Sequence, residues 1–124
     1  MLNTKLLGKW GEALAAEYFQ TKGYKITGMS YQTRFGEIDI IAENREYIVF
    51  VEVKLRKNAC FAEAREYVDE QKIQRIVTTA EIWLSENETK KQPRFDVVEI
   101  YAPSGFHTQN PEINHIENAF GDDK

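Results

Sequence analysis

The stretches GEIDII, at residues 36–41, and IVFVEVK, at residues 48–54, decide the fold. Both are rich in β-branched residues and are separated by a short polar segment. We therefore expect an antiparallel hairpin with strands at residues 36–42 and 47–56. Each strand also carries ionisable side chains among its apolar ones. Carboxylates are rarely buried unless they are paired or bind a cation, so this hairpin is where we expect a functional site.

The register of the hairpin determines which acids meet. A turn whose tip is residues 44–45 places Glu37 opposite Glu52, with Asp39 on the diagonal. A register shifted by two residues keeps the same faces and places Asp39 opposite Glu52 instead. Both registers gather the acids and Lys54 on one face. In both, the opposite face is apolar and is formed by Ile38, Ile40, Val49, Val51 and Val53.

The acid-bearing face suits Mg²⁺, which needs one or two carboxylates and retains several waters. We expect its ligands to be Asp39, Glu52 and the main-chain carbonyl of Val53. The bound cation would polarise a phosphoryl oxygen and activate a water. Lys54, one strand step beyond Glu52, would orient or deprotonate that water, or stabilise charge on phosphorus. The alternative is an exposed amphipathic hairpin with ordinary cross-strand charges.

The rest of the chain predicts helices and further strands around the hairpin. Apolar residues at helical spacing predict a first helix whose inner face is Leu7, Trp10, Leu14 and Tyr18. Asp69 is expected to be the N-cap of a second helix. The predicted elements are a helix at residues 4–22, an edge strand at 24–33, the hairpin, a helix at 70–84, a strand at 95–101 and one short strand near Ile113. This α-β-β-β-α-β order is that of a mixed β-sheet flanked by helices.

The composition is that of one globular domain, residues 1–124, in which residues 117–124 are expected to be a frayed tail. No run reaches the roughly 18 apolar residues of a membrane helix, and we expect no membrane partner. The lone Cys60 fits a reducing compartment, so we expect the cytoplasm. His107 and His115 lack the company of zinc ligands and are expected at the surface.

The charge of the chain is unevenly distributed. The net charge is −4, whereas a passive nucleic-acid binder is usually basic. However, residues 1–60 hold nine Lys and Arg against seven Asp and Glu, and residues 61–124 hold seven against thirteen. The half with the hairpin is thus the basic half, and a bound divalent cation would make it more positive.

Asp39 followed by Glu52-Val53-Lys54 resembles the D…(D/E)xK signature of the PD-(D/E)XK nuclease superfamily. More closely, the chain resembles the endonuclease-like YraN family, which is related to archaeal Holliday-junction resolvases. The resemblance covers nearly the whole chain. Its motifs here are GKWGEALA at residues 8–15, GEID at 36–39, VFVEVK at 49–54, Val68-Asp69 with Lys72, and RFDVV at 94–98. One departure is Phe61-Ala62, where the family usually has Phe-Gly.

The resemblance implies a restriction-endonuclease-like fold and hydrolysis of nucleic-acid phosphodiesters with Mg²⁺, or alternatively Mn²⁺. It implies structured or branched DNA as the substrate, and a homodimer. It adds Glu12 to Asp39 and Glu52 as a catalytic acid and metal ligand, beside the catalytic Lys54; the alternative for Glu12 is a solvated glutamate.

Other charged residues are candidates for a supporting role. Glu37 is either a metal ligand or a support for its strand, and Lys72 either reaches the site or a phosphate, or faces solvent. Arg94 either pairs with Asp96 or binds a phosphate. The expected nucleic-acid contacts are Arg34, Arg56, Lys57 and Arg94, with solvated charges as the alternative for the first three.

Two other functions fit the sequence. One is a catalytically silent module of the same fold that binds nucleic acid or protein, which the acidic net charge favours. The other is a nuclease that acts on RNA. Metal titration distinguishes the silent module from an enzyme. Side-by-side cleavage of DNA and RNA substrates distinguishes a nuclease that acts on RNA from one that acts on DNA.

Overall fold

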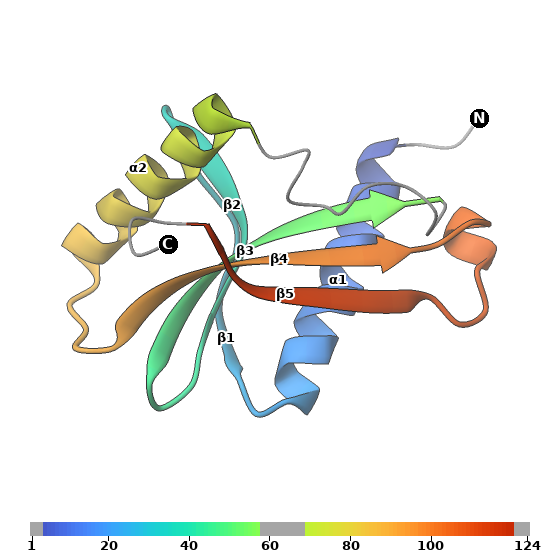
Figure 1. Cartoon of the computed structure of the whole chain (residues 1–124), viewed down its shortest axis with the longest axis horizontal. Helices are drawn as coiled ribbons and strands as arrows, with labels where there is room; N and C mark the ends of the chain where they lie inside the picture. The colour runs from blue at the N-terminus through green and yellow to red at the C-terminus, as the bar shows by residue number, and fades with distance from the viewer. Residues whose placement is uncertain (1–3, 58–68, 121–124) are drawn as a thin grey trace.

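The computed structural model describes residues 4–57 and 69–120 and has the predicted mixed α/β architecture (Figure 1). Helices and strands follow one another in the order that the sequence indicates. The elements are α1 (Thr4–Thr21), β1 (Lys25–Thr33), β2 (Gly36–Glu43), β3 (Tyr47–Arg56), α2 (Glu70–Glu86), β4 (Gln92–Tyr101), the 3₁₀ turn η2 (Gly105–His107) and β5 (Glu112–Phe120). Asp69 is the N-cap of α2, as predicted, and its side chain accepts a hydrogen bond from the Lys72 N–H at 2.8 Å.

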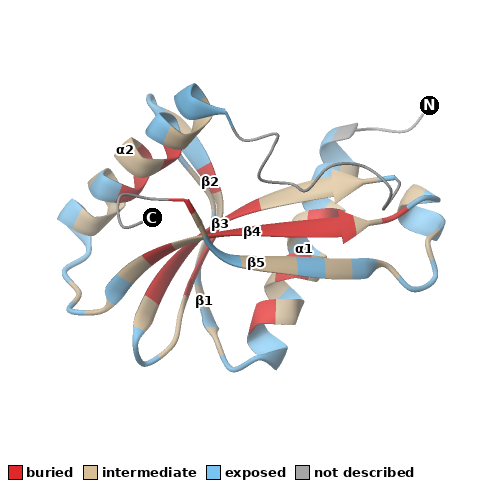
Figure 2. Cartoon of the chain, viewed as in Figure 1, coloured by how far each residue is buried: buried red, intermediate tan, exposed pale blue. Residues whose placement is uncertain are grey.

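The five strands form one sheet in the order β1-β2-β3-β4-β5. Neighbouring strands are antiparallel except β3 and β4, which run parallel because α2 connects them across the sheet. The two helices cover opposite faces (Figure 1). The sheet is thus the middle layer of three, and its central strands are buried on both sides (Figure 2).

Two apolar cores result. The core on the α2 face contains Ile38, Ile41, Ile48, Phe50, Ile76, Ala80, Val97 and Phe120. The core on the α1 face contains Ala15, Phe19, Ile40, Ala42, Val49, Val51, Val98 and Ile100. From Ile40 to Ala42 in β2 and from Ile48 to Val51 in β3, successive residues enter opposite cores, which explains why both strands read as nearly continuous apolar runs.

The inner face of α1 differs from the prediction. Its most buried residues are Gly11, Ala15 and Phe19, while Leu14 and Tyr18 are half-buried at the side. A Cβ at Gly11 would lie 3.1 Å from Leu55 Cδ1, so the helix approaches β3 closely at its small residues. The large side chains predicted as the centre instead form the border of this contact.

The hairpin adopts the shifted register. Ile40 pairs with Val51 and Ala42 with Val49, so the register with its turn tip at residues 44–45 is wrong. The reason lies in the turn, where Asn44 Oδ1 accepts hydrogen bonds from the N–H groups of residues 46 and 47 at 2.9 and 2.8 Å. The Asn44 N–H also donates to the Tyr47 carbonyl at 3.1 Å, so residues 44 and 47 face each other and the turn tip moves to residues 45–46.

The C-terminal prediction is also corrected. Strand β5 continues to Phe120, which is only 7% exposed and stacks on Phe95 with ring centroids 5.4 Å apart. Residues 117–120 are therefore an ordered strand end and not a frayed tail, because the aromatic ring completes the core on the α2 face. Residues 121–124 lie outside the described residues, as do Cys60, Phe61 and Ala62.

Candidate functional site

The sheet forks between β2 and β3. Their last pair is Ile40 with Val51; beyond it, in the described residues, β2 continues beside β1 and β3 continues beside β4. Asp39 and Glu52 are the first residues past this point. The N–H of Val53 donates a hydrogen bond to Asp39 Oδ2 at 2.8 Å. The Asp39 carboxylate thus accepts the hydrogen bond that a main-chain carbonyl of β2 would accept if the two strands stayed paired.

The fork also changes the direction of the β2 side chains. Ile40 packs in the core on the α1 face, but Ile38 packs with Ile41 in the core on the α2 face. The prediction that Ile38 and Ile40 share a face is therefore wrong, because strict alternation does not hold where the two strands separate.

Asp39 and Glu52 meet at the fork in a poorly hydrated place. Glu52 is 7% exposed and Asp39 is half-buried. Burial and the neighbouring charge of Glu52 raise the pKa of Asp39 to about 8, although the hydrogen bond from Val53 opposes this; Glu12 and Glu37 add smaller increases. Burial and the neighbouring carboxylate thus disfavour the ionised form of Asp39, which is the electrostatic setting that a bound cation relieves.

Two lysines lie beside Glu52. Lys72 Nζ is 2.6 Å from Glu52 Oε2, and Lys54 Nζ is 3.5 Å from the same oxygen. Burial and the neighbouring Lys72 lower the pKa of Lys54. The pKa of Lys72 is raised instead; burial opposes the increase, but the ion pair with Glu52, together with the neighbouring Lys54 and Asp39, outweighs it. Lys54 is thus the lysine that is better suited to lose and regain a proton.

Glu12 approaches the fork from α1 and is held by residues that the sequence did not reveal. Ser30 Oγ donates a hydrogen bond to Glu12 Oε1 at 3.2 Å, and Lys9 Nζ donates to Ser30 Oγ at 2.6 Å. Lys9 Nζ is also 3.8 Å from Glu12 Oε1. Ser30 has a φ of +50°, which is uncommon outside glycine. No pattern in the sequence indicates this conformation, although the three-residue spacing of Lys9 and Glu12 is compatible with a helical ion pair.

Because the sheet is open here, side chains from both of its faces act on Asp39. Glu12 on α1 raises the pKa of Asp39, and Asp39 in turn raises the pKa of Lys72 on α2. A cavity of about 200 Å³ lies at this point. Its lining residues are Gly36, Glu37, Asp39, Glu52, Lys72, Arg75 and Ile76. Of these, Arg75 was not predicted.

The predicted nucleic-acid contacts occupy different environments. Arg34 and Lys57 are exposed. Arg56 is half-buried, with Nε 3.6 Å from Oε2 of the fully buried Glu99. Arg94 is 8% exposed and belongs to a separate polar network.

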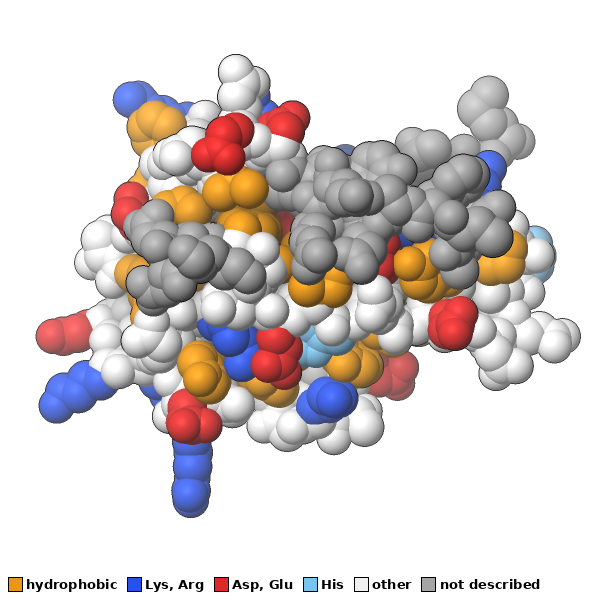
Figure 3. All heavy atoms as spheres, in the orientation of Figure 1, with side chains coloured by type: hydrophobic (Ala, Val, Ile, Leu, Met, Phe, Trp, Pro, Cys, Tyr) orange, Lys and Arg blue, Asp and Glu red, His pale blue; other side chains and the backbone are white. Residues whose placement is uncertain are grey.

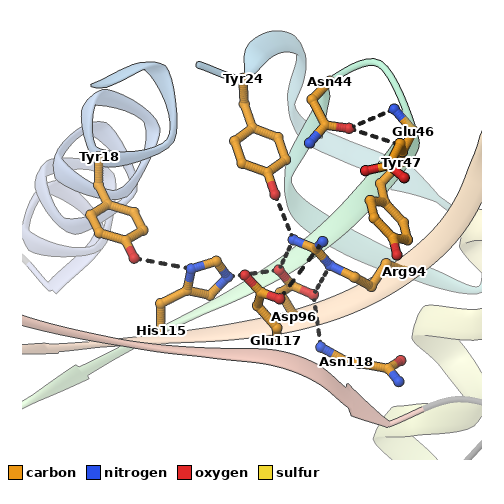
Figure 4. Close-up of polar contacts among 10 residues, drawn as sticks. All are labelled: Tyr18, Tyr24, Asn44, Glu46, Tyr47, Arg94, Asp96, His115, Glu117 and Asn118. Carbon is orange, nitrogen blue, oxygen red and sulfur yellow. Dashed lines mark hydrogen bonds and ion pairs between the residues drawn. The ribbon is translucent and has the colours of Figure 1, made fainter. Parts of the chain in front are cut away.

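That network joins β4, β5 and α1 (Figure 4). Arg94 donates to both oxygens of Asp96, at 2.9 and 2.8 Å, which is the structural pairing foreseen as the alternative. His115 Nε2 lies 2.7 Å from Asp96 Oδ2, and its Nδ1 lies 3.0 Å from the Tyr18 hydroxyl. The side chain of His115 is only 6% exposed, so its predicted surface position is wrong. His115 is buried because it contacts Asp96, a buried residue on the adjacent strand. Nothing in the sequence around His115 indicates this partner.

The donor set at the fork suits a hard divalent cation. Among residues 4–57 and 69–120, no three His, Cys, Asp or Glu side chains lie close enough to hold a metal ion. The carboxylates of Asp39 and Glu52 nevertheless adjoin each other, and Mg²⁺ uses only one or two carboxylates together with water and substrate oxygens. These two residues therefore fit Mg²⁺, and Glu12, positioned by Ser30 and Lys9, adds negative charge to the site from α1.

The fold and this fork define a small mixed-sheet α/β domain with a carboxylate–lysine site whose donors fit a divalent cation. Comparison with known proteins supplies the family. The model of "Uncharacterised protein family UPF0102" matches residues 11–100, and the chain belongs to this family.

Relatives match over nearly their full length. A UPF0102 protein of Caldanaerobacter subterraneus is 42% identical over 126 residues, covering 96% of this chain and 98% of its own. One of Vibrio parahaemolyticus is 39% identical, covering 98% of both chains. One of Clostridioides difficile is 40% identical, covering 96% of this chain and all of its own. In the described part of the chain, neither helix has the length and apolar character needed to cross a membrane.

Proposed function

We propose that this protein is a metal-dependent endonuclease of the PD-(D/E)XK type that hydrolyses phosphodiesters of structured or branched DNA. The observation that carries the proposal is the fork, where Asp39 and Glu52 adjoin each other and Lys54 lies 3.5 Å from Glu52. These are the three residue types of the D…(D/E)xK signature. We place the protein in the cytoplasm and regard a homodimer as compatible with a substrate of two strands.

Asp39 and Glu52 would hold Mg²⁺ or Mn²⁺, with the Val53 carbonyl as a further ligand. When bound, this cation supplies Lewis-acid activation of a phosphoryl oxygen and of a water. Asp39 is pre-oriented for the role by the N–H of Val53. Glu12 supports the site from α1 through its negative charge, and Glu37 does so from the cavity wall.

Lys54 is the residue that moves a proton. Its lowered pKa brings its neutral form closer to physiological pH, so it can accept a proton from the attacking water at Nζ. Lys72 neutralises Glu52 in the absence of a cation. With a cation at the fork, Lys72 would no longer have to neutralise Glu52, and its ammonium would be available to a phosphate oxygen.

Binding to DNA would depend on local contacts. On the face drawn in Figure 3, the described basic and acidic side chains are interspersed and do not gather into a broad patch of one sign. Arg34 and Lys57 remain exposed and available for phosphate contacts. Arg56, beside Glu99, is a third proposed contact. Arg94, the fourth proposed contact, is buried against Asp96 and would have to leave this ion pair to reach a phosphate.

The second candidate is a module of the same fold that binds nucleic acid without hydrolysing it. One observation favours it specifically. Lys72 already neutralises Glu52 at 2.6 Å, so a cation is not required to compensate this carboxylate. In that case the fork would be a structural ion-pair network, and metal binding would be absent.

Cleavage of labelled four-way junction, linear duplex and RNA with Mg²⁺ or Mn²⁺ tests the proposal. We expect Glu52→Gln and Lys54→Met to lower the rate by about 10²- to 10⁴-fold. Glu81→Gln, an exposed acid on α2, is the matched control and should cleave normally. Unchanged rates in both site variants would refute hydrolysis at the fork. Isothermal titration with Mn²⁺ separates the module from the enzyme, since the module would bind no metal but would still bind DNA.

A further inference from the structure

The turn between β1 and β2 presents an exposed aromatic ring. Phe35 is 45% exposed, and the guanidinium of Arg34 lies over its ring at 4.9 Å from the centroid. With 45% of the residue exposed and the guanidinium over the ring, part of the aromatic surface remains open to a flat ligand.

The turn is fixed to the body of the protein. Thr33 Oγ1 accepts a hydrogen bond from the Phe35 N–H at 3.1 Å and lies 3.3 Å from Thr79 Oγ1 on α2. A Cβ on Gly36 would lie 3.0 Å from Thr79 Oγ1 and 3.1 Å from Arg75 Cβ, so the main chain of Gly36 packs directly on α2. Figure 1 shows this turn beside α2. The ring is thus presented on a rigid support, which lowers the entropic cost of binding.

The turn adjoins the fork. Gly36, the residue after Phe35, lines the same cavity as Asp39 and Glu52, and Arg75 lines it from α2. A ligand whose phosphate reaches the fork therefore extends toward the ring. Such a ligand would meet basic as well as aromatic side chains, because Arg34 is exposed beside the Phe35 ring.

The surroundings favour a nucleobase over a protein partner. A protein interface needs a contiguous apolar patch. Phe35 instead has the exposed Arg34 before it and the exposed Glu37 two residues after it in the chain. Within residues 4–57 and 69–120, the other large exposed apolar residues belong to other elements: Leu6 on α1, Met29 in the middle of β1, and Phe106 on η2. A single ring with an adjoining guanidinium is the arrangement that stacks a base and binds its phosphate.

We propose that Phe35 and Arg34 form a stacking platform for an unpaired nucleobase next to the phosphodiester at the fork. This rests on the proposed function and narrows its substrate class to nucleic acids with an unstacked base, such as a single strand, a flap or the branch point of a junction. Continuous duplex offers no free base face and does not use the platform. Stacking of one base on an aromatic ring corresponds to about 5- to 150-fold in affinity.

The test uses oligonucleotides that carry 2-aminopurine at an unpaired position, in EDTA so that no cleavage occurs. Phe35→Leu keeps the apolar area but removes the ring, and Phe35→Trp keeps a ring. Phe106→Leu is the matched control at another exposed phenylalanine. We expect the wild type, Phe35→Trp and Phe106→Leu to quench the fluorescence. Phe35→Leu should lose the quench and bind the unpaired strand about 5- to 150-fold more weakly, with unchanged affinity for duplex.

The proposal is overturned if the wild type gives no quench, or if Phe35→Leu binds both substrates like the wild type. It is equally overturned if Phe35→Leu loses affinity for duplex and single strand alike. A change of oligomeric state in Phe35→Leu, measured by light scattering, would assign the ring to a protein interface instead. Stacking is measured in EDTA and does not depend on hydrolysis. Normal cleavage by Glu52→Gln would therefore refute the proposed function without changing the fluorescence result for Phe35.

Discussion

The buried network around Asp96 permits a quantitative prediction about stability. Asp96 is fully buried and accepts two hydrogen bonds from Arg94 and a third from the Asn118 N–H at 3.0 Å, besides its contact with His115. Asp96→Ala removes the acceptor and leaves the Arg94 guanidinium, itself 8% exposed, without its main partner. Removing one partner of a buried ion pair typically costs about 3–5 kcal/mol.

The structure indicates the lower end of this range. Arg94 Nη1 lies 3.9 Å from Oε1 of Glu117, whose side chain is 62% exposed and can partly replace the lost carboxylate. Tyr24 also keeps its hydrogen bond to Arg94 at 2.9 Å. We therefore expect a loss of about 3 kcal/mol, which is a large part of the about 5–15 kcal/mol typical of a domain.

Urea unfolding followed by tryptophan fluorescence measures this loss at pH 7. The double variant Arg94→Met/Asp96→Ala is the control, and it should recover part of the stability because no buried charge is left unpaired. Binding of Mn²⁺ should be unchanged in both, since the network is separate from the fork. A change below about 1 kcal/mol in Asp96→Ala would refute the reasoning, because that is the size expected of an exposed pair.

The same network predicts a pH dependence with a definite sign. Burial alone would raise the pKa of Asp96, but hydrogen bonds from His115 and Arg94 hold that pKa below its usual value. The ionised form is thus favoured by folding. Its contribution to stability is complete above the ordinary pKa of about 4 and is lost as the pH falls through the lower folded value. Wild-type stability should fall in this acidic range, and Asp96→Ala should show a smaller fall.

Three further predictions concern the fork. Because Asp39 has a raised pKa, folding favours its protonated form, and the metal-free protein should lose stability as the pH rises from about 4 toward 8. Urea unfolding at several pH values measures this, and the same pH dependence of stability in Asp39→Asn would contradict it. Ser30→Gly removes the hydroxyl that holds Glu12 but accepts a positive φ, and should weaken Mn²⁺ binding about 10-fold by calorimetry; unchanged affinity would remove Ser30 from the site. Lys72→Met removes the ammonium from Glu52 and should strengthen Mn²⁺ binding at least about fivefold, whereas weaker binding would show that Lys72 supports the metal.

Local patterns predicted most of the fold. Thr4–Thr21 and Glu70–Glu86 agree with the expected helices, and Asp69 is an N-cap because its short side chain precedes an amphipathic run. Both hairpin strands are confirmed to within a residue. These features are encoded by residues that are close together in the chain, so periodicity and capping are sufficient to find them.

The features that sequence patterns missed depend either on local side-chain and backbone geometry or on partners distant in the chain. The hairpin register depends on how the Asn44 side chain closes the turn, and both registers bury the same apolar faces. The burial of His115 depends on Asp96, 19 residues away. Asp39, Glu52 and Lys54 were predicted from their strand positions, whereas Glu12 and Lys72 came from the resemblance. The part played by Ser30 depends on a backbone conformation that no propensity scale assigns to serine.

The two border strands of the sheet share a property that bears on assembly. In the described chain these are β1 and β5, and each has both a shift in its pairing and one residue at positive φ: Ser30 at +50° and Asn118 at +51°. A strand bent in this way cannot offer an unbroken row of N–H and C=O groups to another chain. Sheet extension between copies is therefore discouraged at both borders, and a homodimer of this protein would associate through its helices or loops.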